Sequence, residues 1–110
     1  MPGQFVINLA TGSLSFSFTL SAAQDLKKAI DELLLHLKTK EPGKTKPHAP
    51  TEYQFTGDVF FEVFCNPNIW PNPFAAKVLV TLRDDRIRVS TETELTAMIA
   101  DLDMYIEQQS

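Results

Sequence analysis

The sequence contains few of the residues that disulfide frameworks, metal sites and phosphate loops need. It has one cysteine, Cys65, so an internal disulfide is excluded and a reducing compartment, the cytoplasm, is expected. Its two histidines have no cysteine, histidine or carboxylate partner at a spacing typical of metal ligands. None of its four glycines lies in a Gly-x-Gly or Gly-Lys-Ser/Thr pattern. We therefore expect no catalytic residue, no metal and no cofactor.

Long apolar runs and an excess of positive charge are missing as well. No apolar run approaches the roughly 20 residues that cross a bilayer. The N-terminal stretch has no basic residue before its first apolar positions, so it lacks the pattern of a secretory signal. The net charge of −4 disfavours nucleic acid as the main partner, because phosphate binding needs concentrated cations. A length of 110 residues with 44% hydrophobic residues suits a single domain over 1–110.

Strict alternation of apolar and polar residues marks the segment 5–20. This period is typical of strands, and it predicts an antiparallel hairpin with one buried and one solvent-exposed face. A two-residue turn at Thr11-Gly12 would pair Leu9 with Leu14 and place the apolar side chains together.

Two helices are predicted, each by a capping box followed by an apolar stripe at helical spacing. Ser21 with Gln24 would begin a helix that runs to about Lys38. Thr91 with Glu94 would begin a second helix that continues to near the C-terminus.

The first helix is followed by a segment rich in proline and lysine, TKEPGKTKPHAPTE at 39–52. It contains no large apolar residue, which is typical of a flexible extended loop. Together with the arginines of the later hairpin, Arg83, Arg86 and Arg88, its lysines would be needed for any nucleic-acid surface.

The most apolar strand of the sequence is predicted at Val59–Phe64. A short strand at Tyr53–Phe55 and a kink at Gly57-Asp58 precede it. Apolar residues occupy both faces of Val59–Phe64, which indicates a strand that is covered on both sides. If both helices pack on one face, something else must cover the other.

A second hairpin is predicted from Ala76–Arg83 and Arg86–Ser90. A turn at Asp84-Asp85 would pair Leu82 with Ile87, although two aspartates also allow a longer loop. The fold class is therefore α+β: an antiparallel sheet of about five strands, built from two hairpins plus a central strand, with two helices on one face. The element order is ββαβββα, or ββαββα if the central strand is long and broken.

An apolar surface gives the strongest functional signal. On the predicted register, the sheet face away from the helices carries Val6, Phe60, Phe64 and Leu79. It adjoins a loop, Asn66–Phe74, whose prolines restrict the backbone and whose Trp70 is the only tryptophan. Trp70 either contacts a partner or folds back onto the core, and the sequence leaves both open. The predicted partner-binding residues are Phe60, Phe64, Asn66, Asn68, Ile69, Trp70, Asn72, Phe74 and Leu79.

Three functions are compatible with these features. The first is a small non-enzymatic protein-interaction or assembly module, which forms a homo-oligomer, a dimer, or binds another protein through the outer face and the loop. The second is a small-molecule binding or enzymatic domain with an aromatic cavity between sheet and helices, lined by Phe16, Phe18, Phe61 and Tyr105. The third is a weak nucleic-acid binder.

Overall fold

A computed structural model of the chain describes residues 3–38 and 47–110. The predicted α+β class and the order ββαβββα are confirmed. The elements are β1 (Gly3–Leu9), β2 (Gly12–Phe18), α1 (Leu20–Lys38), β3 (Thr51–Thr56), β4 (Phe60–Cys65), the short 3-10 helix η1 (Pro67–Ile69), β5 (Lys77–Arg83), β6 (Arg88–Glu94) and α2 (Leu95–Gln109). None of the helices in this described part of the chain is long and apolar enough to cross a membrane.

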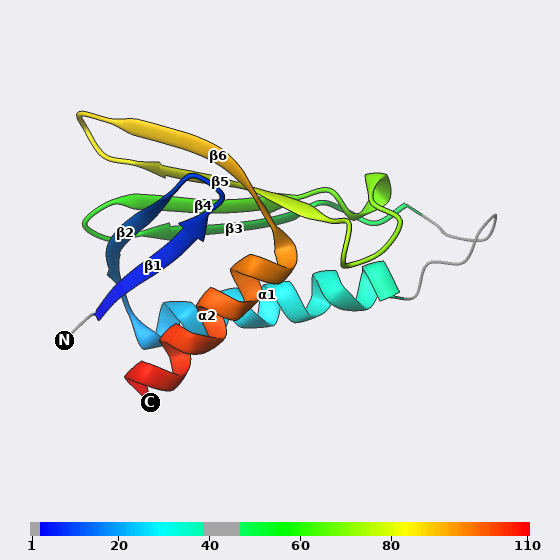
Figure 1. Cartoon of the computed structure of the whole chain (residues 1–110), viewed down its shortest axis with the longest axis horizontal. Helices are drawn as coiled ribbons and strands as arrows, with labels where there is room; N and C mark the ends of the chain where they lie inside the picture. Colours follow the sequence, from blue (N-terminus) through cyan, green and yellow to red (C-terminus); the bar gives the residue numbers. More distant parts are fainter. Residues whose placement is uncertain (1–2, 39–46) are drawn as a thin grey trace.

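The strands form two antiparallel sheets, so the prediction of one sheet with about five strands was wrong. One sheet is the β1–β2 hairpin, and the other has four strands in the order β3-β4-β5-β6. Figure 1 shows the hairpin and both helices on the same side of the four-stranded sheet. The edge of β1 meets α2 instead of another strand, because the Asp101 carboxylate accepts both the backbone N–H of Asn8 at 2.8 Å and its side-chain Nδ2 at 3.0 Å.

The core lies between the hairpin, the helices and the inner face of the four-stranded sheet. Phe5, Phe18 and Phe61 are fully buried there. The rings of Phe16 and Phe61 lie 4.6 Å apart and those of Phe5 and Tyr105 5.3 Å apart, so the aromatic side chains fill the interior against one another. These rings, which the sequence placed around a possible cavity, are packed in mutual contact.

Both helix starts differ from the predicted capping boxes. Thr19 caps α1: its Oγ1 accepts the N–H of Ala22 at 3.0 Å and its carbonyl accepts the N–H of Ala23 at 2.9 Å. Ser21 lies inside the first turn instead. At the second helix, Thr91 and Glu94 lie in strand β6, and the first helical N–H, that of Leu95, donates to the carbonyl of Ala76 at 3.0 Å.

Both hairpins are shifted by two residues from the predicted registers. Leu9 pairs with Gly12 instead of Leu14, and Leu82 pairs with Val89 instead of Ile87. A shift by two leaves every side chain on its predicted face. The longer loop left open for the second hairpin is confirmed, at residues 84–87.

That loop is built on the Asp84 carboxylate. Its Oδ1 accepts the N–H groups of Arg86 at 2.8 Å and Ile87 at 2.9 Å. These backbone hydrogen bonds favour the charged carboxylate and lower the pKa of Asp84 from its ordinary value. A short polar side chain therefore fixes the turn locally.

The loop predicted at 39–52 ends earlier than expected. Residues 39–46 lie outside the described residues. Thr51 and Glu52 belong to β3, where they pair with Cys65 and Phe64. The predicted strand at Tyr53–Phe55 thus extends at both ends, and the predicted kink at Gly57-Asp58 is part of the turn that joins β3 to β4.

Candidate functional site

The outer face of the four-stranded sheet is the surface that the sequence singled out. Along β4 the inner residues Phe61, Val63 and Cys65 are buried, whereas Phe60 and Phe64 on the outer side are half-buried. Both helices and the β1–β2 hairpin lie on the opposite side of the sheet (Figure 1), so within the described residues nothing covers this second face, and the expected cover stays a prediction. A sheet face with half-buried phenylalanines is therefore left open.

Phe64 and Leu79 form the apolar centre of this outer face. They are cross-strand partners in the β4–β5 ladder, so their side chains lie next to each other, and Leu79 is 39% exposed. Phe60 pairs with Arg83 further along, and the Arg83 guanidinium carbon lies 4.3 Å from its ring centroid. This cation–π contact covers part of the Phe60 ring.

Polar side chains border this apolar centre. Gln54 Nε2 donates to Glu62 Oε2 at 2.8 Å, and Thr81 and Ser90 share a hydrogen bond of 3.0 Å between their hydroxyls.

Val6, which was predicted to share this face, lies on the separate β1–β2 sheet, where it is 41% exposed. That part of the prediction was wrong, because the hairpin does not join the four-stranded sheet.

The loop 66–74 is held in one shape by its own asparagines. Asn66 Oδ1 accepts the N–H of Asn68 at 3.0 Å and starts η1. Asn68 then bonds the backbone of His48, accepting its N–H at 2.9 Å and donating to its carbonyl at 2.8 Å. Asn72 Oδ1 accepts the N–H of Ala75 at 2.9 Å. In these bonds the asparagines act within the chain, not toward a partner.

The apolar side chains of this loop divide between the interior and the surface. Trp70 is half-buried and packs against the core. Ile69 and Phe74 are 65% and 84% exposed. Trp70 therefore folds back onto the core, which is one of the two positions that the sequence left open. Ile69 and Phe74 lie exposed at the surface.

The two histidines lie together, which sequence spacing did not indicate. The rings of His36 and His48 are stacked at 3.9 Å with an interplanar angle of 5°. The Nδ1 atom of His36 is buried and has no hydrogen-bond partner among the described residues. Across residues 3–38 and 47–110, no group of three or more His, Cys, Asp or Glu side chains is placed to hold a metal ion.

The two tyrosines of the core make structural bonds. The hydroxyl of Tyr53 donates to the Ala22 carbonyl at 3.0 Å, and that of Tyr105 donates to the Phe18 carbonyl. Burial, and secondarily the Asp25 carboxylate, raises the pKa of Tyr53 to about 12. Burial also raises the pKa of Tyr105, partly opposed by a backbone hydrogen bond from Gly3. Both hydroxyls are thus held in the neutral form at ordinary pH.

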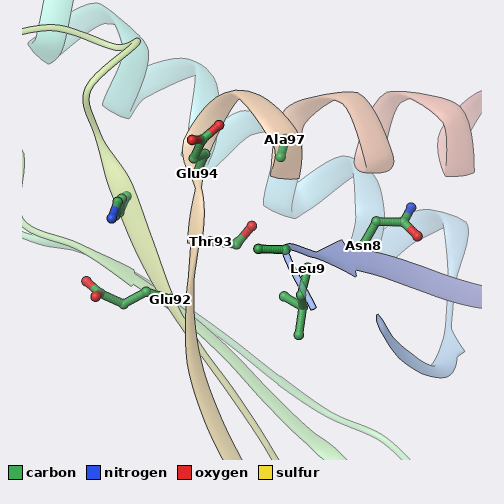
Figure 2. Close-up of a pocket in the computed structure, with 8 residues that line it drawn as sticks. Asn8, Leu9, Glu92, Thr93, Glu94 and Ala97 are labelled. Carbon is green, nitrogen blue, oxygen red and sulfur yellow. The ribbon is translucent and has the colours of Figure 1, made fainter. Parts of the chain in front are cut away.

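A hollow of about 390 Å³ lies where the tip of the β1–β2 hairpin approaches β6. Figure 2 shows Leu9 at the end of β1 and the side chain of Thr93 facing this space, with Glu92 on the other side of the β6 ribbon. Ala97 of α2 completes the wall. Its residues come from elements far apart in the sequence, so no local pattern could have predicted it.

Comparison with protein-family models, curated proteins and solved structures finds no match to this chain.

Proposed function

We propose that the protein is a non-enzymatic interaction module that associates with a second copy of itself through the outer face of the four-stranded sheet and the loop 66–74. The observation that carries the proposal is the open outer face with Phe64 and Leu79 side by side at its centre. Exposed apolar side chains that lie together commonly mark protein contacts. We place this association in the cytoplasm, where the single cysteine stays reduced.

The loop supports the proposal through its rigidity. The bonds of Asn66, Asn68 and Asn72 and the prolines fix the backbone before any partner arrives. Ile69 and Phe74 are then presented to solvent in one arrangement. A preformed loop loses little conformational entropy on binding, so more of the contact energy contributes to affinity.

A non-enzymatic role is supported by the state of the reactive side chains. Cys65 is buried, which keeps a thiol away from substrates. The hydroxyls of Tyr53 and Tyr105 each donate a hydrogen bond to a backbone carbonyl. These groups act in packing, and none of them lies on the open face.

Light scattering over a concentration series tests the proposal. The wild-type mass should rise at least to that of a dimer, and the double variant L79K/F74S should weaken association by about tenfold or more, because central interface side chains contribute over about 1 kcal/mol each. The matched control is V6S, which removes an exposed apolar side chain from the other sheet. A wild-type monomer at every concentration, or a double variant that associates as the wild type does, would contradict the proposal.

A further inference from the structure

Strand β6 forms one edge of the four-stranded sheet, and no other described strand pairs with its free side. In Figure 1 it is the outermost strand of this sheet, and its C-terminal end leads directly into α2. Two of the other edges make contacts with helices: the Asp101 carboxylate of α2 accepts the N–H of Asn8 on β1, and β3 lies beside α1, where the Tyr53 hydroxyl donates to the Ala22 carbonyl. β6, with the sequence RVSTETE, has no proline, no lysine and no bulge.

The ladder with β5 determines which backbone groups of β6 face outward. Hydrogen-bonded and non-hydrogen-bonded pairs alternate along an antiparallel ladder. The bonds from Leu95 N–H to the Ala76 carbonyl and from Asp84 N–H to the Ile87 carbonyl show that the odd-numbered residues of this segment bond to β5. The N–H and C=O groups of the even-numbered residues therefore point away from the sheet: Arg88, Ser90, Glu92 and Glu94.

We infer that β6 pairs in antiparallel fashion with β6 of a second copy, around a two-fold axis at Thr91, and so joins the two four-stranded sheets into one. Pairing of exposed sheet edges is a common mode of association, and a two-fold axis makes it closed. In this register Arg88 lies opposite Glu94 and Ser90 opposite Glu92, and all of these are residues whose backbone groups face outward. Thr91 lies opposite its own copy.

The order of charges along β6 selects this arrangement. The strand begins with Arg88 and ends with Glu92 and Glu94, and all three side chains are exposed. An antiparallel partner brings each arginine against a glutamate, twice in the dimer, whereas a parallel partner would place like charges together. The strand is therefore complementary to a second copy of itself in one direction only.

The hollow beside β6 fits the same arrangement. Ile87, at the end of the β5–β6 hairpin, is 63% exposed. Continuing the register past the strand ends places Ile87 of the second copy opposite Leu95, at the start of α2. That position adjoins the hollow lined by Leu9, Thr93 and Ala97 (Figure 2). The pairing would thus bury an exposed isoleucine in each half of the dimer.

This inference goes beyond the proposed docking face, because it concerns the edge of the sheet, and different variants decide it. S90P removes an outward N–H without removing a bond to β5, so the fold tolerates it while a partner strand cannot pair. S90A is the matched control, since both variants lose the hydroxyl bond to Thr81. Because the edge and the outer face are separate contacts, the wild type and S90A should form species larger than a dimer in sedimentation equilibrium, whereas S90P should stop at the dimer that the outer face forms.

Charge reversal tests the direction of pairing. R88E and E94R should each weaken dimerisation by about tenfold or more, because each places two pairs of like charges across the two-fold. The double variant R88E/E94R restores opposite charges and should recover the dimer. Failure of the double variant to recover affinity above either single variant would overturn the inferred direction.

Oxidative cross-linking tests the register. Across a non-hydrogen-bonded pair the Cα atoms of two Thr91 residues would be about 4.5 Å apart, within disulfide range. T91C should therefore form a covalent dimer, whereas S90C, which faces Glu92 of the second copy, should not. Equal cross-linking by both, or none by T91C, would overturn the inference. Equal masses of S90P and S90A, with association lost in L79K/F74S, would support the proposed docking face and contradict the pairing of β6.

Discussion

Asn68 holds the backbone of His48 with both groups of its side-chain amide. Oδ1 accepts the His48 N–H at 2.9 Å, and Nδ2 donates to the His48 carbonyl at 2.8 Å. A neighbouring strand would satisfy these two backbone groups in the same way. The side chain thereby ties the segment ahead of β3 to the loop 66–74, at the end of the sheet where Phe64 and Leu79 lie.

Replacing this asparagine should destabilise the fold. N68A should lower the free energy of unfolding by about 1.5–4 kcal/mol, because three side-chain hydrogen bonds are lost, two to His48 and one to Asn66 Oδ1, and each contributes about 0.5–1.5 kcal/mol. N68D should also destabilise the fold, since a carboxylate cannot donate to the His48 carbonyl or to Asn66 Oδ1. Urea denaturation followed by circular dichroism measures both, with N72A, which loses the one bond to Ala75, as the milder control. A stability of N68D equal to that of the wild type would contradict the assigned amide.

Tyr53 should make stability fall in alkali. Its pKa is about 12 in the folded protein against 10.0 for the ordinary side chain, so the neutral form is favoured by folding. That contribution is complete below about pH 10 and is lost as the pH rises toward 12; two pKa units correspond to at most about 2.7 kcal/mol, which solvent screening reduces at this half-buried side chain. Y53F, which cannot ionise, should lose less stability than the wild type between about pH 9 and pH 12 in urea titrations. Parallel curves for both proteins would show that Tyr53 does not titrate as described.

The two faces of β4 should respond differently to truncation. Phe61 is fully buried among aromatic rings, so F61A should cost about 3–5 kcal/mol through lost burial and the cavity it leaves. Phe60, its neighbour on the open face, is half-buried beneath Arg83, and F60A should cost about 1 kcal/mol. Denaturant midpoints compare the two variants. Equal losses would mean that the outer face is as well covered as the inner one.

Alternation in the sequence predicted the faces of the strands but not their pairing. Leu9 and Leu82 both lie on the predicted sides, yet each pairs two residues away from its predicted partner. The period of two residues leaves a shift by two undetected, and only the turn decides between such registers. For the second hairpin that decision comes from the Asp84 carboxylate and the two N–H groups it binds.

The number of sheets depended on contacts that no local pattern encodes. The hairpin of β1 and β2 looks able to join the larger sheet, but Asp101, far away in sequence, accepts the Asn8 N–H.

The candidate surface followed from the sequence only in part. Phe60, Phe64 and Leu79 were correctly placed on one open face, because strand period suffices for that. The β6 edge and the hollow beside it follow from tertiary arrangement, so sequence reasoning missed them.

The start of α1 offers a direct comparison between a cap expected from sequence and the one the fold uses. Thr19 Oγ1 bonds the N–H of Ala22, whereas Ser21 lies exposed within the first turn. T19A should therefore cost about 1 kcal/mol, the usual effect of losing a helix cap. S21A should be neutral or slightly stabilising, because alanine is the better helix former by up to about 0.5 kcal/mol. Thermal and urea unfolding measure the loss of stability in the two variants. A larger loss of stability in S21A than in T19A would mean that Ser21, and not Thr19, caps α1.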